Sequence, residues 1–124
     1  MVEGIFEEFS KIQLDPLSYK GDNTLMKYKI EKTNVFNSWL NKLKDKTVVN
    51  RIMARLYRVE YGNFGDVKSV GQNLFELRFF FGSGYRVYYT IKGEKIILLL
   101  CGGDKSSQKQ DIARAITIMD KLEQ

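Results

Sequence analysis

Residues 74–92 hold two alternating apolar segments around a glycine-containing turn, and this pattern limits the folds open to the chain. The apolar residues on one side of each segment are odd-numbered: Phe75, Leu77, Phe79 and Phe81, then Tyr85, Val87, Tyr89 and Ile91. Successive strand side chains point to opposite faces, so these sets share a face only if paired residue numbers have an even sum. A three-residue turn, Gly82–Gly84, meets this condition. The pattern therefore predicts an antiparallel hairpin with one common apolar face.

The same register predicts the opposite face of the hairpin. It pairs Phe80 with Arg86 and Arg78 with Tyr88, so two arginines and two aromatic rings share one outward face. Guanidinium groups bind phosphate through paired donors, and aromatic rings stack on unpaired bases. A solvated sheet surface with ordinary cation–π contacts has the same pattern. The pattern alone leaves both interpretations open.

The rest of the chain predicts an α+β domain with the element order β-α-α-β-β-β-α. Alternation over residues 25–33 predicts a strand, and apolar stripes over 36–43 and 49–59 predict a helical hairpin. Residues 62–73 are glycine-rich and are expected to form a connection.

Two further elements follow the hairpin. Consecutive apolar residues over 95–101 predict a strand with both faces covered. A final helix is expected over about 107–122, with four residues buried at helical spacing: Ile112, Ala115, Ile116 and Met119.

Charge divides the chain into two parts. The chain has 20 basic and 15 acidic residues, a net charge of +5. Residues 1–24 hold two lysines and five acidic residues (−3), which leaves 18 basic and 10 acidic residues (+8) in 25–124. We therefore predict an acidic extension, 1–24, before a basic domain, 25–124. In the acidic extension, apolar residues at helical spacing predict a short amphipathic helix that contains Ile5, Phe6, Phe9 and Ile12. This helix either packs on the domain core or acts as a flap over a basic site or as a docking segment for a partner.

The chain has no histidine and one cysteine. This excludes histidine-dependent triads and dyads, zinc sites of the HExxH or cysteine-cluster type, and an internal disulfide. Residues 2–10 lack the apolar run of a signal peptide, and the longest apolar stretch, 96–101, is too short to span a membrane. We expect a cytoplasmic protein without a metal, a cofactor or a membrane partner.

Basic residues outside the hairpin are further candidates. Lys68 lies in the glycine-rich connection and Lys105 follows the last strand. Each lysine alone is most simply a solvated side chain. Three arginines share the predicted exposed side of the second helix, where they are either solvated or in contact with a nucleic-acid backbone: Arg51, Arg55 and Arg58.

Six short motifs occur in order along the chain: Phe36-x-x-Trp39-Leu40, Arg51-Ile52-x-x-Arg55-Leu56, Gly62-Asn63-x-Gly65-Asp66-x-Lys68, Glu76-Leu77-Arg78, Gly84-Tyr85-Arg86-Val87-Tyr88 and Gly102-Gly103-Asp104-Lys105-x-x-Gln108. Together they resemble the addiction-module killer branch of the RelE/ParE toxin superfamily, akin to HigB toxins and phage-derived relatives, over residues 25–120. The resemblance implies a RelE-like fold, a helical hairpin and a C-terminal helix around a small, mostly antiparallel sheet. It also implies a toxin that cleaves mRNA at the ribosome and is silenced by a helix-turn-helix antitoxin.

The resemblance also implies roles for single residues. Arg86 matches the catalytic arginine of the family, while Arg78 lies near its sheet lysines and Lys105 near the basic residue after the last strand. When a 2′-hydroxyl attacks the adjacent phosphate, an enzyme must remove a proton, stabilise the phosphorane and protonate the 5′-oxygen. Arg78 and Arg86 suit the second task. A lysine close to other cations gives up its proton more readily, which makes Lys68 and Lys105 candidates for the proton transfers.

One departure from the family pattern concerns the last helix. RelE carries a tyrosine early in this helix, whereas this chain has Gln108 and Asp111 there. Tyr88 is the candidate substitute, and the identity of the base stays open. The predicted RNA contacts are Phe80, Arg51, Arg55, Arg58 and Gln108. The alternatives are a non-enzymatic ParE-like gyrase inhibitor and a phage-derived nucleic-acid-binding module.

Overall fold

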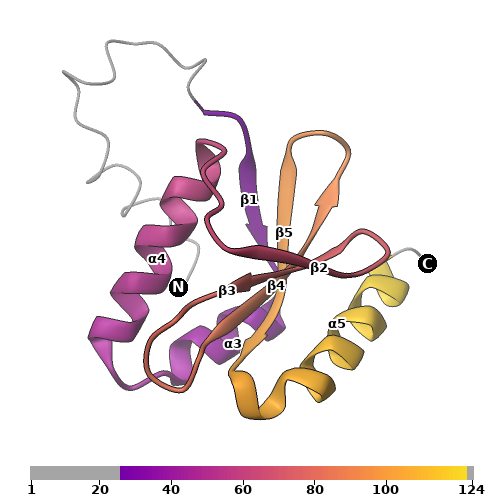
Figure 1. Cartoon of the computed structure of the whole chain (residues 1–124). Helices are drawn as coiled ribbons and strands as arrows, with labels where there is room; N and C mark the ends of the chain where they lie inside the picture. Colours follow the sequence, from indigo (N-terminus) through magenta and orange to yellow (C-terminus); the bar gives the residue numbers. More distant parts are fainter. Residues whose placement is uncertain (1–25, 123–124) are drawn as a thin grey trace, which may run out of the picture.

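A five-stranded mixed sheet forms the centre of the computed structural model, which describes residues 26–122 (Figure 1). In spatial order the strands are β1 (Lys29–Lys32), β5 (Ile96–Gly103), β4 (Arg86–Lys92), β3 (Leu74–Arg78) and β2 (Val67–Gly71). β1 and β5 pair in parallel, and the other neighbours are antiparallel. The helices of the described residues are α3 (Asn34–Lys42), α4 (Lys46–Glu60) and α5 (Gln108–Leu122). The expected α+β fold, a helical hairpin and a C-terminal helix on a mostly antiparallel sheet, is confirmed.

The helices begin where short polar side chains accept hydrogen bonds from free backbone N–H groups. Thr33 Oγ1 accepts from Phe36 N at the start of α3, and Asp45 Oδ1 accepts from Thr47 N at the start of α4. Before α5, Asp104 caps a 3₁₀ turn, Lys105–Ser107, and Ser107 completes a capping box.

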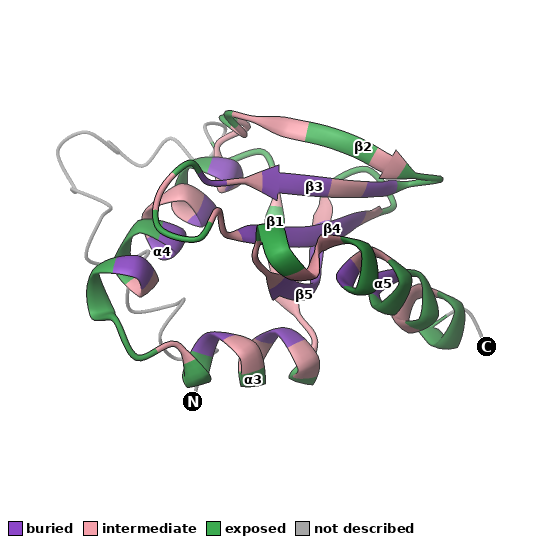
Figure 2. Cartoon of the chain, turned by 60° about the horizontal axis from the view of Figure 1, so that its bottom comes forward, coloured by how far each residue is buried: buried purple, intermediate pink, exposed green. Residues whose placement is uncertain are grey.

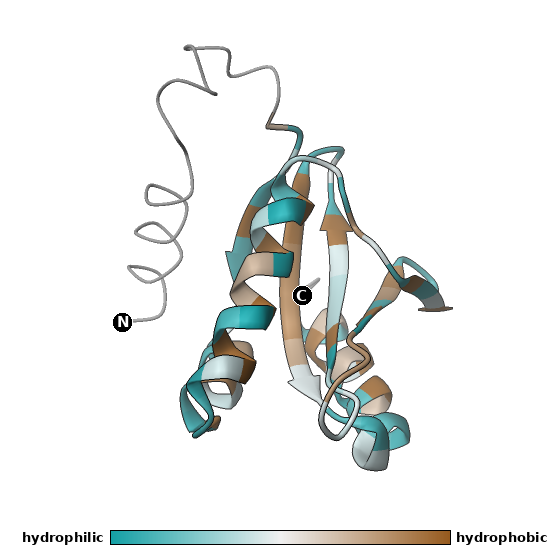
Figure 3. Cartoon of the chain, turned by 60° about the vertical axis from the view of Figure 1, so that its left-hand side comes forward, coloured by the Kyte–Doolittle hydropathy of each residue, from teal (hydrophilic) through white to brown (hydrophobic). Residues whose placement is uncertain are grey.

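Hydrophobic clusters cover both faces of the sheet. One lies beneath α3 and α4, with Phe36, Ile52 and Leu56 packed against Leu99. The other lies beneath α5, where Ala115 packs with residues of β3, β4 and β5. β5 contributes to both clusters, as its consecutive apolar residues predict, and it is the long brown strand in Figure 3. Figure 2 shows the buried central strands between helices whose outer sides are exposed.

The hairpin register differs from the predicted one by two residues. Arg78 pairs with Arg86 and Glu76 with Tyr88, so paired numbers still have an even sum and the apolar faces match as expected. The predicted three-residue turn is wrong. The last backbone bond of the ladder runs from Phe79 N to Tyr85 O and encloses a five-residue loop, 80–84. Gly82 and Gly84 have positive φ there, a backbone conformation that glycine adopts easily and that lets the chain reverse within this longer loop.

Three other expectations need correction. Residues 62–73 are not only a connection, because β2 lies within them and pairs with β3. The Tyr88 side of the hairpin is not outward, because α5 covers it and Tyr88 is fully buried. On α5, Ile116 is 45% exposed rather than buried. The acidic extension lies outside the described residues. No helix among residues 26–122 is long and apolar enough to cross a membrane.

Candidate functional site

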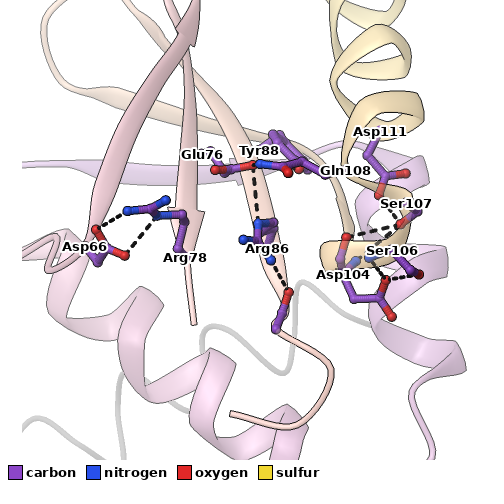
Figure 4. A network of polar contacts seen from close by, with 11 residues as sticks. Asp66, Glu76, Arg78, Arg86, Tyr88, Asp104, Ser106, Ser107, Gln108 and Asp111 are labelled. Atoms are coloured by element: carbon purple, nitrogen blue, oxygen red, sulfur yellow. Dashed lines mark hydrogen bonds and ion pairs between the residues drawn. The ribbon is translucent and has the colours of Figure 1, made fainter. Parts of the chain in front are cut away.

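Two arginines face each other across β3 and β4 near the end of the hairpin. Arg78 and Arg86 are a directly opposed pair, so their side chains leave the sheet on the same face. Arg78 is the more exposed of the two, with 31% of its side chain accessible. Its Nε and Nη2 bind both carboxylate oxygens of Asp66 at 2.9 and 3.2 Å (Figure 4). This charged hydrogen bond raises the pKa of Arg78 and keeps the guanidinium cationic.

Arg86 is more enclosed and is held differently. Its side chain is 10% exposed, and Nη1 donates to Gly84 O in the hairpin loop at 2.6 Å. Nε lies 3.5 Å from Glu76 Oε2, an ion pair that includes no hydrogen bond from Nε. The loop and the buried carboxylate therefore fix two sides of the guanidinium.

Glu76 is a fully buried carboxylate at the centre of this network. Its Oε2 accepts from Tyr88 Oη at 2.9 Å and from Gln108 Nε2 at 2.7 Å (Figure 4). Its Oε1 is buried without a hydrogen-bond partner. A buried polar atom left in this state costs about 1–3 kcal/mol. Burying the Glu76 carboxylate therefore costs stability that an apolar side chain at the same position would not cost.

Tyr88 and Gln108 both donate hydrogen bonds to this carboxylate, and Tyr88 is closed to solvent. Burial, and then the bond to Glu76, raise the pKa of the Tyr88 phenol. With no exposed area, Tyr88 has no surface from which to contact RNA in this structure. Gln108 is half-buried and joins the start of α5 to β3. Tyr88 therefore does not occupy the outward position that the sequence analysis gave it, whereas the RNA contact expected of the half-buried Gln108 stays a prediction.

Lys68 and Lys105 border the same region from two sides. Lys68 pairs with Glu76 across β2 and β3, so it lies on the arginine face, and it is exposed. Lys105 is also exposed and lies beside the hairpin loop, where its N–H donates to Ser83 O at 3.3 Å. We call Lys68, Arg78, Arg86 and Lys105 the basic face. The structure thus brings together four of the five predicted catalytic residues, and Tyr88 lies beneath them.

The start of α5 comes close to β5 because residue 103 is a glycine. A Cβ at Gly103 would collide with the Asp111 carboxylate and come within 2.9 Å of Ser107 Oγ. Asp104 then caps the turn, and the hydrogen bond from Ser106 lowers the pKa of its carboxyl. This turn sets the backbone position of Lys105.

The predicted RNA contacts on α4 divide into two kinds. Arg51 and Arg58 are exposed and border a groove of about 320 Å³ that Phe80 also lines. Phe80 is 78% exposed, and Arg78 Cζ lies 5.8 Å from its ring centre. The groove lies on the α4 side of the sheet, and Phe80 links it to Arg78 of the basic face.

Arg55 differs, and its expected place on the exposed side of α4 is wrong. Its guanidinium donates to Phe64 O, Asp66 O and Arg78 O at 2.7–2.9 Å and covers the Phe79 ring. Burial lowers the pKa of Arg55, because charge is less stable away from water. Arg55 therefore holds the segment before β2 and the end of β3 against α4.

Sequence reasoning also missed Asp66 and Glu76 as members of the site. Both belong to the quoted motifs, but only the β2–β3–β4 register brings them to the arginines. A usable signal was present at Glu76, a carboxylate on the same strand face as Arg78 in a hairpin rich in apolar residues.

Together these features define a small α+β domain with a basic face at one end of its sheet. A family model described as phage-derived protein Gp49-like (DUF891) matches residues 38–123, and the chain belongs to this family. An uncharacterized protein of Haemophilus influenzae is 46% identical over 97 residues, which cover 78% of this chain and 98% of that protein. Among solved structures, the toxin-antitoxin complex RelBE2 from Mycobacterium tuberculosis contains a chain with 19% identity and a TM-score of 0.45. The match covers 68% of this chain and 99% of that chain.

Proposed function

We propose that the protein is the toxin of a toxin-antitoxin system and an endoribonuclease that cleaves mRNA at the ribosome. The observation that carries the proposal is the opposed pair Arg78–Arg86, with Lys68 on the same face of the sheet and Lys105 beside the hairpin loop. Arginine and lysine side chains gathered in one region suit a phosphate whose negative charge increases during cleavage. The motif resemblance to RelE-like toxins points to the same chemistry.

The two arginines suit the phosphorane because their positions are already fixed. Asp66 holds Arg78 through two hydrogen bonds, while the hairpin loop and Glu76 hold Arg86. Donors that need no rearrangement stabilise a transition state better than mobile ones. We assign charge stabilisation to this pair.

The proton transfers fall to the exposed lysines on either side. Lys68 approaches the arginines from β2, and Lys105 from the turn after β5. An acid on one side and a base on the other fit an in-line displacement, in which the attacking 2′-oxygen and the leaving 5′-oxygen lie on opposite sides of the phosphorus. We assign these lysines to the acid and base roles as a pair, without ordering them.

The neighbouring groove suits the nucleotides beside the cleaved bond. Phe80 presents an exposed ring for stacking on a base, and Arg51 and Arg58 offer charge to the backbone. The cognate antitoxin and the ribosome are the partners that the proposal implies. We expect the antitoxin to be a helix-turn-helix protein, as the resemblance implies.

Primer extension on a defined mRNA tests the proposal, with full-length protein added in the presence and absence of ribosomes. We expect discrete cleavages within codons when ribosomes are present. Arg86→Ala should lower the cleavage rate by about 10²–10³-fold, the usual loss when one fixed donor to a developing negative charge is removed. Lys121→Ala is the matched control, because it also removes one positive charge but lies in the last turn of α5.

Two results would refute the nuclease, and a third would refute its assignment to the basic face. Intact transcripts together with double-stranded DNA breaks would identify a gyrase inhibitor. Tight RNA binding without cleavage would identify a binding module. Equal losses of activity in Arg86→Ala and Lys121→Ala would show that cleavage responds to net charge rather than to the basic face.

A further inference from the structure

We propose that Glu76 is the positioning residue for Arg86, and that its buried carboxylate orients the guanidinium toward the scissile phosphate. This inference rests on the proposed function. Glu76 is fully buried, its Oε2 lies 3.5 Å from Arg86 Nε, and the Arg86 side chain is 10% exposed. The ion pair thus links Glu76, which is closed to solvent, to Arg86, part of which is exposed at the surface.

The bonding of the guanidinium shows how this orientation arises. Nη1 donates to Gly84 O, and Nε faces the carboxylate. Among the described residues, none accepts a hydrogen bond from Nη2. Two sides of the planar group are therefore fixed, and the third is left to bind an anion.

The surroundings of Glu76 hold the carboxylate itself in place. Tyr88 Oη, from the neighbouring strand, and Gln108 Nε2, from the start of α5, both donate to Oε2. An oxygen held by donors from two elements has little freedom to turn, and it transmits that restriction to Arg86.

Stability alone does not explain the pair. A buried ion pair contributes little to stability, because removing both charges from water offsets their attraction. Here Glu76 Oε1 and Arg86 Nε are both buried and lack hydrogen-bond partners. Unsatisfied groups of this kind are retained where function requires them.

A direct catalytic role for Glu76 is excluded by its place in the fold. A general base must come within hydrogen-bonding distance of the proton that it removes. Glu76 has no exposed area, and Tyr88, Gln108 and Arg86 surround its Oε2. It therefore acts through Arg86.

Asp66 offers an internal comparison. It also binds an arginine, but 32% of its side chain is exposed and water screens the pair. We expect Asp66→Asn to lower the cleavage rate less than Glu76→Gln does.

Single-turnover cleavage of mRNA on ribosomes by the full chain provides the activity test. Glu76→Gln preserves the shape of the side chain and removes its charge. We expect the cleavage rate constant to fall about 10–100-fold, as misplaced catalytic groups usually cause, with RNA binding changed less than about threefold. Glu31→Gln is the matched control, because it removes a carboxylate that pairs with Lys92 at the surface.

A double-mutant cycle separates positioning from general damage to the fold. If Glu76 acts through Arg86, adding Glu76→Gln to Arg86→Ala causes no further loss of rate. If the two losses multiply, the proposal is wrong. If Glu76→Gln fails to fold, Tyr88→Phe is the substitute variant. It removes one hydrogen-bond donor to Glu76, and Tyr88 is fully buried and so makes no contact with RNA. We then expect a rate loss of a few fold at unchanged RNA binding, and an unchanged rate would overturn the proposal.

The NMR signal of Arg86 Nε–Hε distinguishes this inference from the proposed function. We expect the signal to shift and to exchange faster with water in Glu76→Gln, and to stay unchanged in Glu31→Gln. If the wild type fails to cleave RNA but this pattern holds, the proposed function fails while Glu76 still positions Arg86. If the signal is the same in wild type and Glu76→Gln, the positioning role is refuted.

Discussion

Arg55 joins α4 to two other parts of the chain through three hydrogen bonds, and Arg55→Lys tests how much stability this contact supplies. The bonds run from Nε to Phe64 O at 2.8 Å, from Nη1 to Arg78 O at 2.7 Å and from Nη2 to Asp66 O at 2.9 Å. Lysine keeps the charge but replaces the flat, forked guanidinium with a single ammonium group. The substitution therefore removes geometry while preserving net charge.

The expected loss follows from these bonds. A hydrogen bond from a charged donor contributes about 1.5–3 kcal/mol. We expect the ammonium to keep one of the three bonds, so losing the other two sets an upper limit of about 3–6 kcal/mol. Water reaches this half-buried site and solvates part of what is lost. The free energy of unfolding should therefore fall by about 2–4 kcal/mol.

Urea unfolding followed by circular dichroism measures this loss. Arg58→Lys, one turn further along α4, is the control, because Arg58 is exposed and its free energy of unfolding should change by less than about 0.5 kcal/mol. If Arg55→Lys and Arg58→Lys are equally stable, the three carbonyl contacts do not hold the segment before β2 and the end of β3 against α4.

Buried titrating groups supply two further predictions. Burial raises the pKa of the Tyr89 phenol to about 12, above the value near 10 of an unfolded chain, so its share of stability is complete below pH 10 and is lost as pH rises toward 12. Tyr89→Phe should reduce the fall in unfolding free energy between pH 10 and 12 by about 2 kcal/mol, and an unchanged pH profile in urea unfolding would contradict this. Burial also raises the pKa of the Cys101 thiol to about 12, so a thiol-reactive dye at pH 8 should label the protein only after unfolding. Rapid labelling of the folded protein would refute the buried position of Cys101.

The alternation in residues 74–92 predicts which side chains share a face, but it does not fix which residues pair. Parity follows from the two-residue period of a strand, and the even-sum rule is met in the structure. The exact partners depend on the conformation of the loop. Gly82 and Gly84 permit positive φ, and the loop takes five residues rather than three. Arg78 therefore lies opposite Arg86 instead of Tyr88.

The buried positions of Glu76 and Tyr88 could not be predicted from the sequence, because they depend on how α5 packs on the sheet. The even-numbered hairpin residues read as an outward set, yet α5 covers Tyr88 and Glu76 and leaves the arginines at the margin. Arg55 shows the same difficulty on α4. Helical spacing groups it with Arg51 and Arg58, whereas its place in the fold is decided by carbonyl groups of residues 64–78. Contacts between distant segments, rather than local pattern, determine both outcomes.

The parallel pairing of β1 with β5 has a consequence for synthesis. Lys29 of β1 pairs with Ile96 of β5, so β1 cannot join the sheet until β5 has been synthesised. Chains emerge from the ribosome N-terminus first, and contacts between distant residues form late. Arg86 lies on the strand beside β5, and Lys105 follows it. A nascent chain that has not yet reached β5 therefore lacks the complete surface with which, on our proposal, the folded protein binds RNA.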